Sequence, residues 1–146
     1  AMQALANGEI SSGDIVVLRM LGPVGGPGTV FACSFMAALS GAGLADTVAV
    51  VTDGELSGLN KGITIGQVMP EAALGGPLAI VEENDQVKID LNERKIDLLI
   101  EEALLNQRLD NWKPVERTLE NNWLKFYADN VMPLEKGAVF GKREGY

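Results

Sequence analysis

One loop of this sequence has the composition of a reactive segment. Residues 52–62, TDGELSGLNKG, follow a short apolar run and place Ser57 between Gly54 and Gly58. A serine hydroxyl is a weak nucleophile and a weak base unless a neighbouring group activates it. The sequence contains no histidine, so a Ser-His-Asp triad is excluded. Two interpretations stay open from the residues alone. Either Ser57 is an ordinary turn residue, or a cationic group from elsewhere lowers the pKa of its hydroxyl.

A second loop is rich in glycine and precedes a predicted helix. Residues 22–28, GPVGGPG, cannot form regular structure because glycines and prolines interrupt them. An ATP-binding P-loop is rejected, because Pro27 and Gly28 occupy the positions of its required Gly-Lys pair. Free amides at a helix N-terminus favour an anion, so the loop is either a plain strand-to-helix turn or a segment that approaches a ligand. The glycines expected at a ligand are Gly25, Gly26, Gly28, Gly54 and Gly58.

Other conspicuous residues favour structural interpretations. We interpret Lys61 as a solvated loop residue, and Glu71 as a carboxylate that complements the dipole of a short helix. Cys33 lies on an apolar helix and is interpreted as a core thiol. Four aromatic residues are expected to pack two C-terminal helices onto the body of the domain: Trp112, Trp123, Phe126 and Tyr127.

Composition and charge exclude several classes of function. The 146 residues carry a net charge of −8 and show no basic patch, which disfavours nucleic acid and anionic membranes as partners. No apolar run approaches the length of a membrane span. A single cysteine and no histidine exclude a Cys/His zinc site, a four-cysteine cluster built by one copy, and an intrachain disulfide. We therefore expect a cytoplasmic protein.

The apolar patterns predict a mixed α/β domain. We expect one domain over 2–146, with Ala1 as a cloning scar and 141–146 as a flexible tail. The expected strands are 15–20, a buried strand at 47–52, 63–68, 77–85 running into a turn, and a hairpin of 86–92 with 94–100. The expected helices are 29–43, with Thr29 as N-cap and Gly41 or Gly43 as stop, a turn or two within 69–76, 101–112 and 117–131. SSGDIVVLR and EENDQVKIDL both place an aspartate before an alternating strand, which favours a barrel-like sheet over a doubly wound one.

An ordered series of segments carries a family resemblance. GEISSGDIVVLRMLGPVGGPG, SGAGL, VAVVTDGELSG and KGITIGQVMPEAALGGPLAIVEENDQVKID follow one another in this order, and NQRLDNWKP and LEKGAV come later. Together they resemble the C-terminal domain of the dihydroxy-acid dehydratase and phosphogluconate dehydratase family, over roughly residues 4–140.

The resemblance implies a fold, a reaction and partners. The family's C-terminal domain has a swivelling β-barrel-like (β/β/α) fold flanked by helices. The members are hydro-lyases that form 2-keto acids from dihydroxy acids or sugar acids. Their N-terminal domain provides an iron–sulfur cluster and most magnesium ligands, and they are typically homo-oligomers. For this chain, the resemblance implies a cluster-bearing N-terminal domain or subunit as partner, a small anionic hydroxy or 2-keto acid as ligand, and Ser57 as the base that takes the C2 proton.

Several positions depart from the family pattern. Glu55 stands where the family has arginine, Gln67 where it has histidine, and Phe31 where it has a magnesium-ligand glutamate. The residues after Gly58 are Leu59 and Asn60, where the family has small residues followed by Ser or Thr. Phenylalanine cannot coordinate a hard cation. An alternative function is therefore a non-catalytic paralogue that binds anions or mediates oligomerisation. In either case we expect this chain alone to bind no metal or cluster.

Overall fold

The computed structural model describes all residues except 29, 59, 116–118, 120–121 and 143–146. Three sequence predictions fall at least partly on the omitted residues and lie outside the described part of the chain. They are the N-cap at Thr29, the first turn of the predicted helix 117–131, and the end of the predicted tail.

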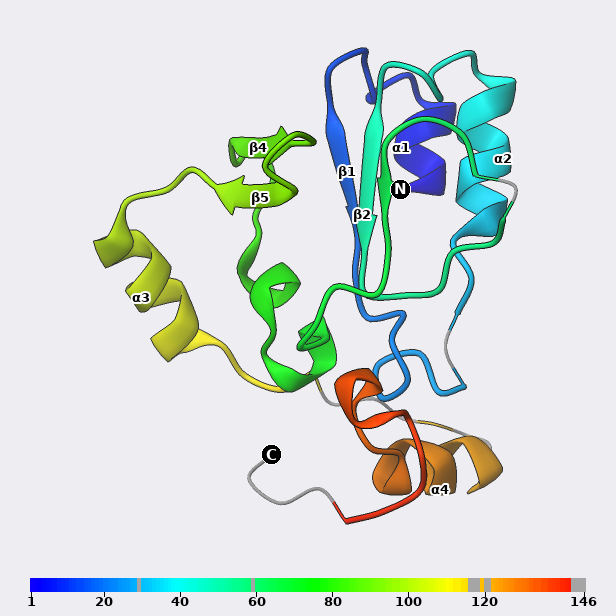
Figure 1. The fold of residues 1–146 in the computed structure, drawn as a ribbon, viewed down its shortest axis with the longest axis vertical. Coiled ribbons are helices and arrows are strands. Elements are labelled where there is room, and N and C mark those ends of the chain that lie inside the picture. Colours follow the sequence, from blue (N-terminus) through cyan, green and yellow to red (C-terminus); the bar gives the residue numbers. More distant parts are fainter. Residues whose placement is uncertain (29, 59, 116–118, 120–121, 143–146) are drawn as a thin grey trace.

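A parallel sheet forms the centre of the domain (Figure 1). Its strands are β1 (Ile15–Leu18), β2 (Ala49–Thr52) and β3 (Thr64–Ile65), and they pair in the order β1-β2-β3. The register sets Val16 opposite Val50 and Val51 opposite Ile65. Every residue of β2 is buried, which confirms the prediction of an interior strand from its continuous apolar run.

Helices α1 (Met2–Ala6) and α2 (Cys33–Gly41) cover one face of this sheet (Figure 1). The core between α2 and the sheet is built from buried apolar side chains: Ala32, Phe35, Met36, Leu39, Val48 and Val50. The spacing of its helical members is that of one helix face. Cys33 lies off this face and is exposed, so the prediction of a core thiol is wrong.

The opposite face carries short elements rather than long helices. The 3-10 turns η1 (Ala72–Leu74) and η2 (Pro77–Ile80) lead to an antiparallel hairpin of β4 (Val87–Asp90) and β5 (Lys95–Leu98). The hairpin is confirmed, but the predicted strand at 77–85 is wrong. Arg19, which follows β1, donates hydrogen bonds to the carbonyls of Leu78, Ala79 and Val81 at 2.8–3.0 Å. Because these carbonyls accept from the Arg19 guanidinium, they cannot pair with a neighbouring strand, which explains why 77–85 forms no strand.

Arg108 anchors helix α3 (Glu102–Asn111) beside the hairpin. Its guanidinium forms two hydrogen bonds with the Asp85 carboxylate, at 2.6 and 3.0 Å, and an ion pair with Glu82. The hydrogen bonds from Arg108 hold the pKa of the Asp85 carboxyl below its usual range. Asp85 also accepts from the Glu82 amide, as Asp14 does from the Ser11 amide. The two similar sequence segments therefore form the same local turn.

The C-terminal part contains α4 (Asn122–Asn130) and the 3-10 turn η3 (Leu134–Lys136). Trp112 packs against Gly75, where a Cβ would lie 3.1 Å from the indole ring. This confirms the prediction for Trp112. The prediction is wrong for Trp123 and Phe126, which are 60% and 48% exposed, whereas Tyr127 is partly buried.

The mixed α/β class is confirmed. The described strands form two separate sheets, one parallel and one antiparallel, and close no barrel. No helix in the described part of the chain is both long and apolar enough to cross a membrane.

Candidate active site

Three loops meet at one edge of the parallel sheet. They follow β1, β2 and β3, and their described residues are 19–28, 53–58 and 66–71. Because parallel strands all end at the same edge, the segments that follow them converge there. In open α/β sheets, ligands bind outside the carboxyl ends of the strands. Both glycine-containing loops that the sequence singled out lie at this edge.

Asp53 ties the three loops together. It follows β2 directly and is fully buried. Its carboxylate accepts hydrogen bonds from the amides of Met20 and Leu21, at 3.1 and 2.9 Å, and from the amide of Ala72 at 2.9 Å. Sequence reasoning missed this residue. The available signal was a carboxylate placed directly after a continuously apolar strand and before glycine.

Glu71 organises the glycine-rich loop. Its side chain is fully buried, and its two carboxylate oxygens accept from the amides of Val24 and Gly25, at 2.9 and 3.0 Å. The prediction that Glu71 complements a helix dipole is wrong. The structure forms only a 3-10 turn from Ala72 onward, and the carboxylate bonds to a loop 46 residues earlier in the chain.

The five glycines predicted at the ligand fall into two groups. The amides of Gly25, Gly26 and Gly54 already have acceptors within the loops: Glu71, the Gly22 carbonyl and the Thr52 hydroxyl. A Cβ on any of the three would come within 3.0 Å of another atom, so these glycines permit close packing. Gly28 and Gly58 have open space where a Cβ would lie.

Ser57 lies in the loop after β2 and is partly exposed. Its carbonyl accepts a hydrogen bond of 2.6 Å from the Asn60 side-chain amide, which closes the loop on itself. Among the described residues, no side chain is hydrogen-bonded to the Ser57 hydroxyl. Lys61 is exposed, in agreement with its interpretation as a solvated loop residue.

Three positions at which the resemblance predicts a departure from the family pattern lie together. Phe31 and Glu55 form an isolated parallel bridge, in which the Glu55 amide donates to the Val30 carbonyl at 3.1 Å. The Glu55 carboxylate accepts a hydrogen bond of 2.8 Å from the Gln67 side chain. Phe31 is 54% exposed. Phe31 and Gln67 therefore both contact Glu55, which belongs to the Ser57 loop.

The described residues at this edge do not by themselves fit a metal or an iron–sulfur cluster. Phe31 offers no oxygen, and the carboxylates of Asp53 and Glu71 are occupied by backbone amides. Among the described residues, no group of three or more His, Cys, Asp or Glu side chains could hold a metal ion.

A cavity of about 550 Å³ lies elsewhere. It is lined by the turn before β1 and the segment before β4, and it includes the carboxylates of Glu9, Asp14 and Glu82. Neither Ser57 nor the glycines of the two loops line it. We place the candidate site at the sheet edge, because the cavity offers carboxylates without a convergent set of loops.

The geometry thus defines a mixed α/β domain with a candidate site at the carboxyl edge of a parallel sheet. Residues 1–138 match the family described as dihydroxy-acid/6-phosphogluconate dehydratase, C-terminal. The chain is similar to dihydroxy-acid dehydratases from Thermodesulfovibrio yellowstonii (46% identical over 139 residues) and Geobacter metallireducens (47% over 139). A third such relative is the dehydratase from Pyrococcus abyssi (44% over 140 residues).

This chain belongs to the dihydroxy-acid and 6-phosphogluconate dehydratase family, as its C-terminal domain. The three alignments cover 95–96% of the chain and 25% of each relative. The chain therefore spans about a quarter of the length of the curated relatives it matches.

Proposed function

We propose that this chain is the C-terminal domain or small subunit of a hydro-lyase that converts a dihydroxy acid or sugar acid to a 2-keto acid. One observation carries the proposal: the family match spans residues 1–138 and includes the Ser57 loop, which follows the carboxyl end of β2. The similar proteins are dihydroxy-acid dehydratases, which favours a dihydroxy acid as substrate.

The reaction needs a base and a leaving hydroxyl. The base removes the proton from C2, the electrons of that C–H bond form a C=C bond, and hydroxide leaves C3. The enol tautomerises to the 2-keto acid, and the proton and hydroxide together make water. We assign the role of base to Ser57. Among the described residues, no side chain is hydrogen-bonded to its hydroxyl. A neutral hydroxyl is too weak a base for this step, so the required positive charge must come from the rest of the protein.

Other residues of this chain position the loop. Asp53 and Glu71 fix the three loops through backbone amides. Gly28 and Gly58 leave room for a ligand to approach the backbone. The Gln67 side chain donates a hydrogen bond to the carboxylate of Glu55, which lies in the same loop as Gly58. This carboxylate disfavours a second negative charge and would restrict how an anionic substrate is oriented.

The finer expectations extend this proposal. We propose that an N-terminal domain or subunit holds the iron–sulfur cluster and magnesium, and that the complete protein is a homo-oligomer with a swivelling, barrel-like C-terminal domain. We also propose a cytoplasmic location. The single cysteine can form no intrachain disulfide, which fits a reducing compartment.

A chimera tests the proposal. This chain would replace the matching 139-residue segment of the T. yellowstonii dehydratase, and turnover of a 2,3-dihydroxy acid would be measured. We expect turnover by the chimera and none by this chain alone. Ser57→Ala should lower kcat by about 10²–10⁴-fold, the usual contribution of a general base. Ser40→Ala, at an exposed position of α2, is the matched control.

Each adverse result has a distinct meaning. Retained activity in Ser57→Ala removes Ser57 from proton transfer. If the chimera folds but dehydrates nothing while the parent enzyme is active, the non-catalytic alternative is favoured. The domain exchange would then have replaced a working domain by an inactive one.

A further inference from the structure

Three aromatic side chains form an exposed patch at the C-terminal end of the molecule. Trp123 and Phe126 lie on α4, and Phe140 comes from the segment after η3; they are 60%, 48% and 53% exposed. The Trp123 and Phe126 rings stack with centroids 5.5 Å apart, and Phe140 lies edge-on to both, at 6.4 and 5.7 Å. We refer to these three residues as the aromatic patch.

The aromatic patch is held in place by ordered structure beneath it. Phe140 forms an antiparallel bridge with Val131, which is fully buried. Tyr127 on α4 packs edge-on against Phe140 with ring centroids 5.4 Å apart. The charges nearest in α4, Lys125 and Asp129, pair with each other at 3.2 Å. The described residues thus hold the patch in a fixed arrangement, and the two charges beside it on α4 balance each other; both are properties of a buried interface.

The area of the patch helps to identify its occupant. A large aromatic side chain buries about 150–250 Å², so three half-exposed rings offer on the order of 300 Å² for burial. A stable association of two separate chains needs about 800 Å² per partner. The patch is therefore too small to hold a second copy by itself, but it suits one part of a larger interdomain contact.

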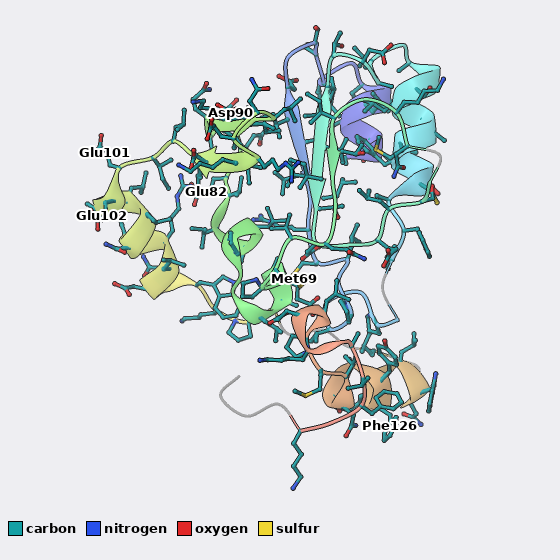
Figure 2. All side chains as sticks on the ribbon, in the orientation of Figure 1. Met69, Glu82, Asp90, Glu101, Glu102 and Phe126 are labelled. Atoms are coloured by element: carbon teal, nitrogen blue, oxygen red, sulfur yellow. The ribbon has the colours of Figure 1, made fainter. Side chains whose placement is uncertain are left out.

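The position of the patch points to the same occupant. Along the long axis of the molecule, α4 lies at the end toward which β1 and β2 run, beyond the loops of the candidate site (Figure 1). Figure 2 shows Phe126 at this end, far from Glu101 and Glu102 at the start of α3. The chain spans 25% of its relatives, so a body about three times larger completes the protein in those relatives. A body that covers the candidate site would extend toward α4.

We propose that the aromatic patch of Trp123, Phe126 and Phe140 is a docking surface for the N-terminal, cluster-bearing part of the dehydratase. The inference rests on the proposed function, because that function requires such a part. The patch makes an apolar contact beside the candidate site, and it places the Ser57 loop over the groups that the other part supplies.

Hydrogen exchange tests the inference in two samples, the isolated chain and the full-length chimera with the T. yellowstonii N-terminal part. We expect the amides of Trp123–Asn130 to exchange about tenfold more slowly in the chimera, as burial of a surface helix reduces its local opening. In the chimera carrying Trp123→Ser and Phe126→Ser, this protection should be lost. Leu104→Ser is the control, since Leu104 is 39% exposed on α3, and it should retain the protection.

The outcomes separate this inference from the proposed function. Protection at Gly54–Gly58 without protection at Trp123–Asn130 overturns the docking surface alone. Protection of both segments in a chimera without turnover leaves the docking surface supported and overturns the proposed function. If neither segment is protected, both are overturned. If the isolated chain is a dimer that already protects Trp123–Asn130, the occupant is a second copy and the inference is wrong.

Discussion

Removal of the Asp53 carboxylate should loosen the whole candidate site. Asp53 is fully buried and accepts three backbone hydrogen bonds, two through Oδ2 and one through Oδ1. Asp53→Ala would leave the amides of Met20, Leu21 and Ala72 without their acceptor. A buried N–H that loses its partner costs about 1–3 kcal/mol. Water that enters the site can accept hydrogen bonds from some of these amides, so the three costs do not add in full. We therefore expect Asp53→Ala to lower the free energy of unfolding by about 3–4 kcal/mol.

A second variant separates the charge from the shape. In Asp53→Asn, the amide oxygen can take the place of Oδ2 and keep the two bonds from Met20 and Ala72. The side-chain NH₂ would then face the Leu21 amide, donor against donor. We expect a loss of about 1–2 kcal/mol, intermediate between wild type and Asp53→Ala.

Urea unfolding followed by circular dichroism measures these losses. Asp46→Ala is the control, because Asp46 is exposed and should change the free energy of unfolding by less than about 0.5 kcal/mol. If Asp53→Ala is no more destabilising than this control, the carboxylate does not hold the three loops, and the account of the site's construction is wrong.

Three further predictions concern charge and close packing. Since the folded pKa of Asp85 lies below its unfolded value of about 3.9, its contribution to stability is present above pH 4 and is lost as the pH falls through the folded pKa. Arg108→Gln should flatten the dependence of urea stability on pH below about pH 4, and an unchanged slope would contradict this. Gly76→Ala should prevent stable folding, because a Cβ there would overlap the Pro70 carbonyl oxygen. The control Gly41→Ala has open space around the new Cβ and should fold normally. Equal melting temperatures for the two variants would refute the prediction. Glu55→Gln in the active chimera should lower KM for an anionic acid several-fold by removing a nearby negative charge, and an unchanged KM would place the substrate carboxylate away from this loop.

Local patterns in the sequence determined much of the secondary structure. The continuous apolar run of β2 predicted its burial, and the alternating residues of β4 and β5 predicted a hairpin that the structure confirms. The ordered segments predicted the family that the comparison confirms. These features follow from residue order within a few turns or strands, so no tertiary information was needed to find them.

Only the tertiary structure decided what distant residues do to one another. Glu71 reads as a helix-start residue in sequence, yet its carboxylate holds a loop 46 residues earlier. Phe31, Glu55 and Gln67 are far apart in sequence but lie together in space. Trp123 and Phe126 were expected to pack a C-terminal helix onto the body, whereas their side chains are largely exposed. Residue type and local periodicity set which groups need partners, but the choice of partner depends on long-range geometry, which a single sequence does not encode in any local pattern.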